Sequence, residues 1–332
     1  KDYEVLMLKI GITTTVPVEI ILAAGYTPID LNNIFIMDKE PNKLVEEAET
    51  AGYPRNICGW IKGLYSVVLS TENKIDKVIA VTQGDCSNTH ALMETLQLSG
   101  VETIPFAYPF DRDYDLLKLQ MDKLIKILGT DWDSVEYQRK RLINVRKKVA
   151  EIDTLTWRDN TVSGIDNHIF QVSCSDFDGD VDLFEKKVDK FLLKAKTAPE
   201  KNEEIRLAFI GVPPICPDLY NYLESIGARI VFNEVQRQFA MPNSTDDIVE
   251  QYQLYTYPYG VFGRLEDIKS QMEKRNIDGV IHYVQSFCYR QIEDMIFREK
   301  LNLPLLTIEG DKPGKIDART KLRIDSFVEM LK

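Results

Sequence analysis

The stretch Val280-Ile-His-Tyr-Val-Gln-Ser-Phe-Cys-Tyr-Arg290 gives the clearest indication of how this 332-residue chain folds. It begins as an apolar run, which predicts a buried strand, and passes through a polar turn to Cys288. The residues that follow have helical spacing, so we expect Cys288 between the carboxyl end of a strand and the start of a helix. Ligands of open α/β sheets lie at such strand ends, and a helix amino terminus stabilises a thiolate. The stretch therefore predicts an α/β sheet with a functional cysteine at its edge.

Two more cysteines have similar surroundings. Cys86 follows an apolar run at 78–82, which predicts another strand. Cys58 lies in the turn Pro54-Arg-Asn-Ile-Cys-Gly59, directly ahead of an apolar segment with helical spacing. We expect Cys58, Cys86 and Cys288 to converge on one crevice from separate elements.

Strands and helices alternate at both ends of the chain. The pattern predicts an N-terminal α/β lobe at 1–110, a helical connecting region at 111–200, and a C-terminal α/β lobe at 201–332. Such alternation favours two Rossmann- or flavodoxin-like lobes with parallel sheets, and a ligand in the cleft between them. Residues 28–33 are expected to form a short strand, and Asp218 is expected to cap the helix that follows it.

The charge balance excludes some classes of protein. The chain has 41 basic and 52 acidic residues, a net charge of −11, which argues against nucleic-acid binding. The basic clusters Arg139-Lys-Arg141 and Arg146-Lys-Lys148 indicate a solvated helix face. No run of about 18 apolar residues predicts a membrane span, and no export signal is apparent at the start of the sequence. We therefore expect a cytoplasmic protein.

The cysteine count argues against a disulfide framework. Five widely spaced cysteines are an odd number, and five buried thiols in a reducing compartment are the simplest alternative to a functional role. The sequence has no Walker loop, no Gly-x-Gly-x-x-Gly after a strand and no paired-cysteine zinc signature. The cysteines that follow strands are thus the strongest candidates for chemistry.

Several stretches, in this order and spacing, are shared with a known family. They are Pro17-Val-Glu-Ile-Ile-Leu-Ala-Ala-Gly25, the turns around Cys58 and Cys86, the unit at 218–234, the segment from His282 to Cys288, and the C-terminal run from Leu303. Together they resemble the iron–sulfur subunits of the 2-hydroxyacyl-CoA dehydratase and benzoyl-CoA reductase family, which includes double-cubane cluster proteins. The resemblance extends over nearly the whole chain.

The resemblance implies a cofactor and a reaction type. By position, Cys58, Cys86 and Cys288 match the family's ligands of a [4Fe-4S] cluster in the cleft between the lobes, which leaves one iron without a cysteine. The implied enzyme performs one-electron reduction or radical dehydration of a small substrate, for which an acyl-CoA is a candidate. An ATP-dependent iron–sulfur activator protein supplies the electron, and the chain pairs as a homodimer or with a related subunit.

Three alternatives stay open at this point. The first is a low-potential reductase with a double-cubane [8Fe-9S] cluster, for which five cysteines do not suffice unless another ligand contributes; Cys216, after a strand, is the candidate fourth thiol. The second is a non-catalytic cluster protein that carries electrons. The third is a two-lobe small-molecule binder without metal.

Polar residues near the three cysteines are candidates for further roles. Hydroxyl and amide groups at a strand end can donate hydrogen bonds to cluster sulfides, and a carboxylate there can act as an acid or base. Ordinary turn or cap roles are the alternative for each residue. The candidates are Ser87, Asn88 and Gln285 for cofactor binding, and His282, Ser286 and Glu309 for catalysis.

Overall fold

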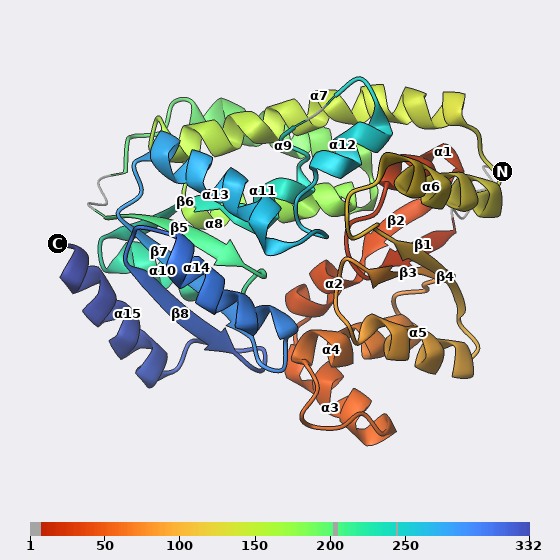
Figure 1. Ribbon diagram of the computed structural model, residues 1–332, viewed down its shortest axis with the longest axis horizontal. Helices are drawn as coiled ribbons and strands as arrows, with labels where there is room; N and C mark the ends of the chain where they lie inside the picture. Colours follow the sequence, from red (N-terminus) through yellow and green to blue (C-terminus); the bar gives the residue numbers. More distant parts are fainter. Residues whose placement is uncertain (1–7, 202–204, 244) are drawn as a thin grey trace.

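Two four-stranded parallel sheets form the framework of the protein (Figure 1). The computed structural model describes residues 8–201, 205–243 and 245–332. The first sheet has the order β2-β1-β3-β4 and the second the order β6-β5-β7-β8, with every pair parallel. This confirms the predicted fold class, because 2-1-3-4 is the flavodoxin-like order. The strands are β1 (Lys9–Ile12), β2 (Thr27–Asp30), β3 (Lys77–Gln83), β4 (Glu102–Ala107), β5 (Ile205–Gly211), β6 (Ala228–Asn233), β7 (Gly279–Gln285) and β8 (Leu305–Gly310).

Helices cover the sheets and connect them. The first group is α1 (Val18–Ala23), α2 (Leu31–Met37), α3 (Pro41–Ala51), α4 (Gly59–Leu69) and α5 (Thr89–Leu98). The connecting region holds α6 (Tyr114–Leu128), α7 (Trp132–Trp157), α8 (Gly164–Val172), α9 (Val181–Ala195), and the 3-10 turns η1 (Ser173–Ser175) and η2 (Phe177–Gly179). The last group is α10 (Leu219–Ser225), α11 (Glu234–Phe239), α12 (Ile248–Leu254), α13 (Val261–Arg275), η3 (Tyr289–Glu293), α14 (Asp294–Lys300) and α15 (Ala318–Leu331).

Helix α7 runs along one side of both sheets (Figure 1), and two of its arginines are buried. Arg139 forms an ion pair with Glu136, and Arg146 forms one with the buried Glu19 of α1 at 2.6 Å. The predicted solvated face is therefore wrong for these two residues. Helix spacing alone does not show that one turn of a basic cluster faces a buried carboxylate.

Apolar packing ties the two sheets together. One hydrophobic cluster joins residues of β1, β3, α6, α7 and α9 to the aromatic segment 252–259 from the second half of the chain. Another joins α2 and α4 to residues of β5 and β8. Because each cluster draws on both halves, burial of apolar surface fixes the sheets relative to each other. The division at 1–110, 111–200 and 201–332 stays a prediction.

Local capping corrects two expectations. The predicted strand at 28–33 ends at Asp30, whose carboxylate accepts the amide hydrogen of Asn32 at 2.9 Å and starts α2. Asp218 does not cap α10 through its side chain, and its carboxylate instead accepts the amide hydrogen of Ile316 at 2.9 Å. In both cases the carboxylate bonds to a backbone amide, but the sequence does not reveal which one.

The carboxyl end of β5 requires glycine. Gly211 has φ +94°, and an added Cβ would lie 2.1 Å from the carbonyl oxygen of Tyr283. We expect Gly211→Ala to lower the free energy of unfolding by about 3 kcal/mol or more, because the conformation is strained and the clash involves backbone. Gly25 is the control, since its φ of +78° is similar and no atom lies within 4 Å of an added Cβ. Denaturant unfolding that gave equal losses for Gly211→Ala and Gly25→Ala would contradict the steric argument.

Candidate functional site

One cavity of about 140 Å³ lies at the carboxyl ends of strands from both sheets. In each sheet the strand order reverses between two neighbouring strands, which are β1 and β3 in the first sheet and β5 and β7 in the second. Ligands of such folds bind at this point, outside the carboxyl ends of the strands. Residues at or just after β1, β2, β3, β5 and β7 line the cavity, together with the start of α4. They include Thr13, Thr14, Asp30, Asp85, Cys86, Val212, Gln285, Cys288 and Cys58.

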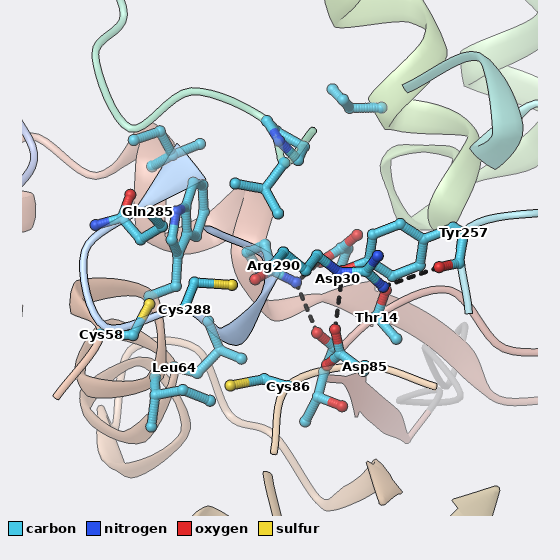
Figure 2. A pocket seen from close by; sticks show the side chains of 18 of the residues that line it. Thr14, Asp30, Cys58, Leu64, Asp85, Cys86, Tyr257, Gln285, Cys288 and Arg290 are labelled. Atoms are coloured by element: carbon cyan, nitrogen blue, oxygen red, sulfur yellow. Dashed lines mark hydrogen bonds between the residues drawn. The ribbon is translucent and has the colours of Figure 1, made fainter. Parts of the chain in front are cut away.

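The cavity brings the three predicted cysteines together. Cys58 directly precedes α4, Cys86 follows β3, and Cys288 directly precedes η3. Figure 2 shows their sulfur-bearing side chains in one part of the cavity. The turn after Cys288 is a 3-10 turn of five residues, so the expected regular helix begins only at Asp294.

For each cysteine, the backbone amide of the residue two positions later in the sequence favours the ionised form of the thiol. The amide of Asn88 donates to Cys86 Sγ at 3.4 Å. The amides of Trp60 and Arg290 similarly lower the pKa values of Cys58 and Cys288. These amides favour the thiolate form of the three cysteines.

Burial nevertheless dominates the protonation of these thiols. It raises the pKa of Cys58 to about 11, and it raises the pKa values of Cys86 and Cys288 as well. The charge of Asp85 and of neighbouring thiolates acts in the same direction for Cys58 and Cys86. Three thiolates therefore need a cation or cluster between them, since metal coordination deprotonates a thiol.

The donor set fits an iron–sulfur cluster better than a single ion. Within residues 8–201, 205–243 and 245–332, no three His, Cys, Asp or Glu side chains are grouped to hold one metal ion. A cubane differs because each cysteine binds a separate iron. Three thiols around one cavity thus suit a cluster that keeps one iron free of cysteine. The other two cysteines lie elsewhere: Cys174 is buried against the carbonyl of Phe170, and Cys216 lines a neighbouring groove.

A polar group that the sequence analysis missed completes the wall. Tyr257 donates its hydroxyl hydrogen to Asp85 at 2.9 Å, and Arg290 donates to the carbonyl oxygen of Tyr257 at 2.9 Å. Burial raises the pKa of Asp85 to about 6, although Tyr257 and Arg290 both oppose the shift. Asp85 directly precedes Cys86, and Arg290 follows Cys288 by two positions. Their closeness to the cysteines in the sequence was the signal that could have identified them as site residues.

The comparisons with known proteins identify the family of this chain. The family described as 2-hydroxyglutaryl-CoA dehydratase, D-component, matches residues 13–331. The chain belongs to this dehydratase family. The match confirms the resemblance seen in the sequence, while a comparison with curated proteins gave no match. Among the described residues, no helix combines the length and apolar character that crossing a bilayer requires.

Gln285 is the one polar candidate that lines the cavity of this dehydratase-family chain. Its Nε2 donates to the carbonyl oxygen of Asp311 at 2.6 Å, and its buried Oε1 has no hydrogen-bond partner in the described structure. Ser286 lies outside the lining and donates to Glu309 Oε1 at 2.8 Å. Glu309 is exposed and also accepts a hydrogen bond from Gln291.

The other candidates also lie outside the cavity lining. Ser87 is exposed, and Asn88 precedes α5 with only its backbone amide near Cys86. His282 is buried in β7, where its Nδ1 lies 2.7 Å from a carboxylate oxygen of Asp294. Burial lowers the pKa of His282, so the ring is held as a neutral group of the core. The catalytic and cofactor roles suggested for these residues stay predictions.

A pair of buried carboxyl groups lies beside the cysteines of this dehydratase-family site. Asp30 lines the cavity, and Asp176 Oδ2 accepts the amide hydrogen of Asp30 at 2.7 Å. Each residue is 5% exposed. Burial raises both pKa values, that of Asp176 to about 8, with the charge of Asp30 adding to the shift. The two residues are 146 positions apart, so no sequence pattern linked them.

The raised pKa of Asp176 predicts a pH-dependent stability. A folded-state pKa of about 8 against an ordinary 3.8 means that this group stabilises the fold fully below pH 3.8. The contribution is lost as pH rises through about 8. We expect Asp176→Asn to remove this loss, so that the melting temperature of the variant falls less between pH 5 and pH 9. Wild-type and variant curves that stayed parallel across this range would contradict the prediction.

A larger open groove of about 1370 Å³ adjoins the cavity. Asn33, His168 and Pro214 line both, so the groove borders the cavity that holds the cysteines. Burial lowers the pKa of His168 to about 4, which keeps this ring neutral at physiological pH.

Proposed function

We propose that this chain is the iron–sulfur subunit of an enzyme that removes water from a small 2-hydroxyacyl thioester. The observation that carries the proposal is the convergence of Cys58, Cys86 and Cys288 on one cavity in a chain that matches the dehydratase family over residues 13–331. The cavity extends beyond the cysteines to polar side chains and a groove. This favours an enzyme over a protein that only carries electrons.

Cys58, Cys86 and Cys288 would hold a [4Fe-4S] cluster. When bound, such a cluster supplies one-electron chemistry and an iron that is open to a substrate oxygen. A single cubane is preferred to a double-cubane [8Fe-9S] cluster because Cys174 and Cys216 do not line the cavity. We therefore propose a dehydratase rather than a low-potential reductase with a larger cluster.

The protein groups around the cavity would orient the substrate and exclude water. Arg290, which is 4% exposed, presents the one cationic side chain among the lining residues. The open Oε1 of Gln285 can accept a hydrogen bond from a substrate hydroxyl. These groups are fixed by bonds to Tyr257 and Asp311, so they need no rearrangement when a ligand enters.

Electron supply requires a partner, for which we propose an ATP-dependent iron–sulfur activator. No nucleotide-binding motif occurs in this sequence. Exposed apolar side chains flank Cys288 and continue into the next helix: Phe287 is 53% exposed, Ile292 71%, and Met295 at the start of α14 74%. Exposed apolar side chains that gather on one surface are typical of a protein–protein contact. Pairing with a second copy or a related subunit belongs to the same proposal.

The decisive experiment is iron and sulfide analysis after anaerobic purification, with an EPR spectrum of the reduced protein. About four irons per chain would support a single [4Fe-4S] cluster, and about eight would indicate the double cubane. Dehydration of a 2-hydroxyacyl thioester in the presence of an activator would establish the reaction. Absence of iron after reconstitution would overturn the proposal.

A further inference from the structure

Two carboxyl groups stand where the cysteine cavity meets the open groove. Asp30 lines the cavity and Asp176 lines the groove, and Asn33 borders both spaces. Asp30 is fixed as the last residue of β2 and the cap of α2, and the bond from its amide holds Asp176 beside it. A substrate that enters through the groove therefore passes this pair before it reaches the thiols.

The cations nearest the pair are engaged by other groups. Neither carboxylate forms an ion pair with Lys or Arg in the parts of the chain that the structure describes. Asp178, whose amide donates to Asp176, pairs outward with Lys187. Arg146, on α7, is taken up by Glu19.

The remaining titratable groups facing the pair also leave it uncompensated. Asp85 is a further carboxyl, and the ring of His168 on α8 is neutral. Arg290 lines the same cavity as Asp30 but pairs with Glu293 at 3.6 Å and donates to the carbonyl oxygen of Tyr257. Two neighbouring buried carboxyl groups without an ion-pair partner resist double ionisation, so we expect the pair to retain one proton at neutral pH. Titratable groups of this kind are suited to acid–base chemistry.

An independent feature of the cavity indicates a ligand with a hydroxyl group. Gln285 is 1% exposed and its Oε1 has no partner within the described residues, although its Nε2 is bonded. A buried acceptor without a donor is costly unless a ligand satisfies it. A 2-hydroxyacyl group carries such a donor on the atom that the dehydration removes.

We propose that Asp30 exchanges protons with the substrate during dehydration and that Asp176 is the positioning residue that keeps one proton in the pair at neutral pH. The inference rests on the proposed function. The carbon–oxygen bond breaks, and the hydroxyl takes a proton from the pair and leaves as water. The adjacent carbon–hydrogen bond breaks, and its proton returns to the pair. One water is lost, and the substrate is neither oxidised nor reduced overall.

The experiment compares Asp30→Asn and Asp176→Asn with the control Asp182→Asn, which changes a surface carboxylate that pairs with Arg141. Infrared difference spectra of the purified protein report protonated carboxyl groups directly. We expect a carboxylic acid band that disappears as pH rises through about 8, is absent in Asp176→Asn and persists in Asp182→Asn. The band does not depend on turnover, so it tests the shared proton even in a preparation without activity.

Turnover tests the role of the proton. Asp30→Asn is expected to lower kcat at least about 100-fold, the usual contribution of a general acid or base, with iron content unchanged. Asp176→Asn is expected to move the alkaline limb of the rate profile to lower pH, because Asp30 no longer has a neighbouring carboxyl group that raises its pKa, while Asp182→Asn leaves the profile as in the wild type. Near-normal turnover of Asp30→Asn, or an unmoved limb in Asp176→Asn, overturns the inference. A wild-type protein without iron or dehydration overturns the proposed function instead, and with it the role toward substrate.

Discussion

Replacing Cys288 by alanine is expected to remove the iron from a protein that stays folded. The side chain lies at the start of a short turn in the cavity wall, is partly buried, and belongs to none of the apolar clusters of the described core. Its loss leaves two thiols, Cys58 and Cys86, in the lining, too few to hold a cubane against exchange with solvent ligands. We expect nearly all iron to be lost. Activity should fall by more than the 10–100-fold loss that is usual when a residue hydrogen-bonded to a metal ligand is replaced.

Cys216→Ala and Cys174→Ala are the matched controls. Cys216 lines the groove outside the cavity, and Cys174 is fully buried beside Phe170. Both variants should retain the iron of the wild type, with Cys174→Ala less stable because it leaves a small cavity. Retention of iron in Cys288→Ala would refute the ligand assignment. Loss of iron in Cys216→Ala would indicate the larger cluster.

The fold and the cysteines were predictable because the signals for them are local. An apolar run followed by a polar turn and a helical period marks the carboxyl end of a strand within about ten residues, as around Cys86 and Cys288. Parallel strands then place all such ends on one edge of a sheet. The predicted strand at 28–33 is an exception in the first sheet. It ends at Asp30, because the carboxylate of this residue caps α2 and the following residues are helical.

The rest of the site depends on contacts that no local pattern contains. Tyr257 bonds to Asp85 across 172 positions, and Asp176 to Asp30 across 146. His282 shows the converse, because its place in the quoted strand suggested catalysis whereas its ring lies against Asp294 and Phe297, away from the cavity lining. In a strand, alternate residues point to opposite faces, and periodicity in a fully buried strand does not tell which face meets the ligand.

Replacing Arg264 by methionine is expected to destabilise the protein by about 3–5 kcal/mol, the usual cost of breaking a buried ion pair by removing one partner. Arg264 on α13 is fully buried and donates to Glu234 at 2.6 Å and to Glu293. Glu234, 1% exposed, also accepts the amide hydrogen of Gly211 at 2.9 Å. The variant leaves Glu234 as a buried charge with one remaining donor, and urea unfolding under anaerobic conditions measures the loss.

Two comparisons separate the lost pair from lost packing. The double variant Arg264→Met with Glu234→Gln should recover part of the stability, because the uncompensated charge is gone. Arg298→Met, which breaks a half-exposed pair with Asp294, should cost less than about 1 kcal/mol. Equal losses in Arg264→Met and the double variant would show that packing dominates.

Since Glu293 belongs to η3, the turn directly after Cys288, we expect Arg264→Met also to retain iron less firmly. This pair would thereby connect the stability of the second sheet to the geometry of the cysteine cavity.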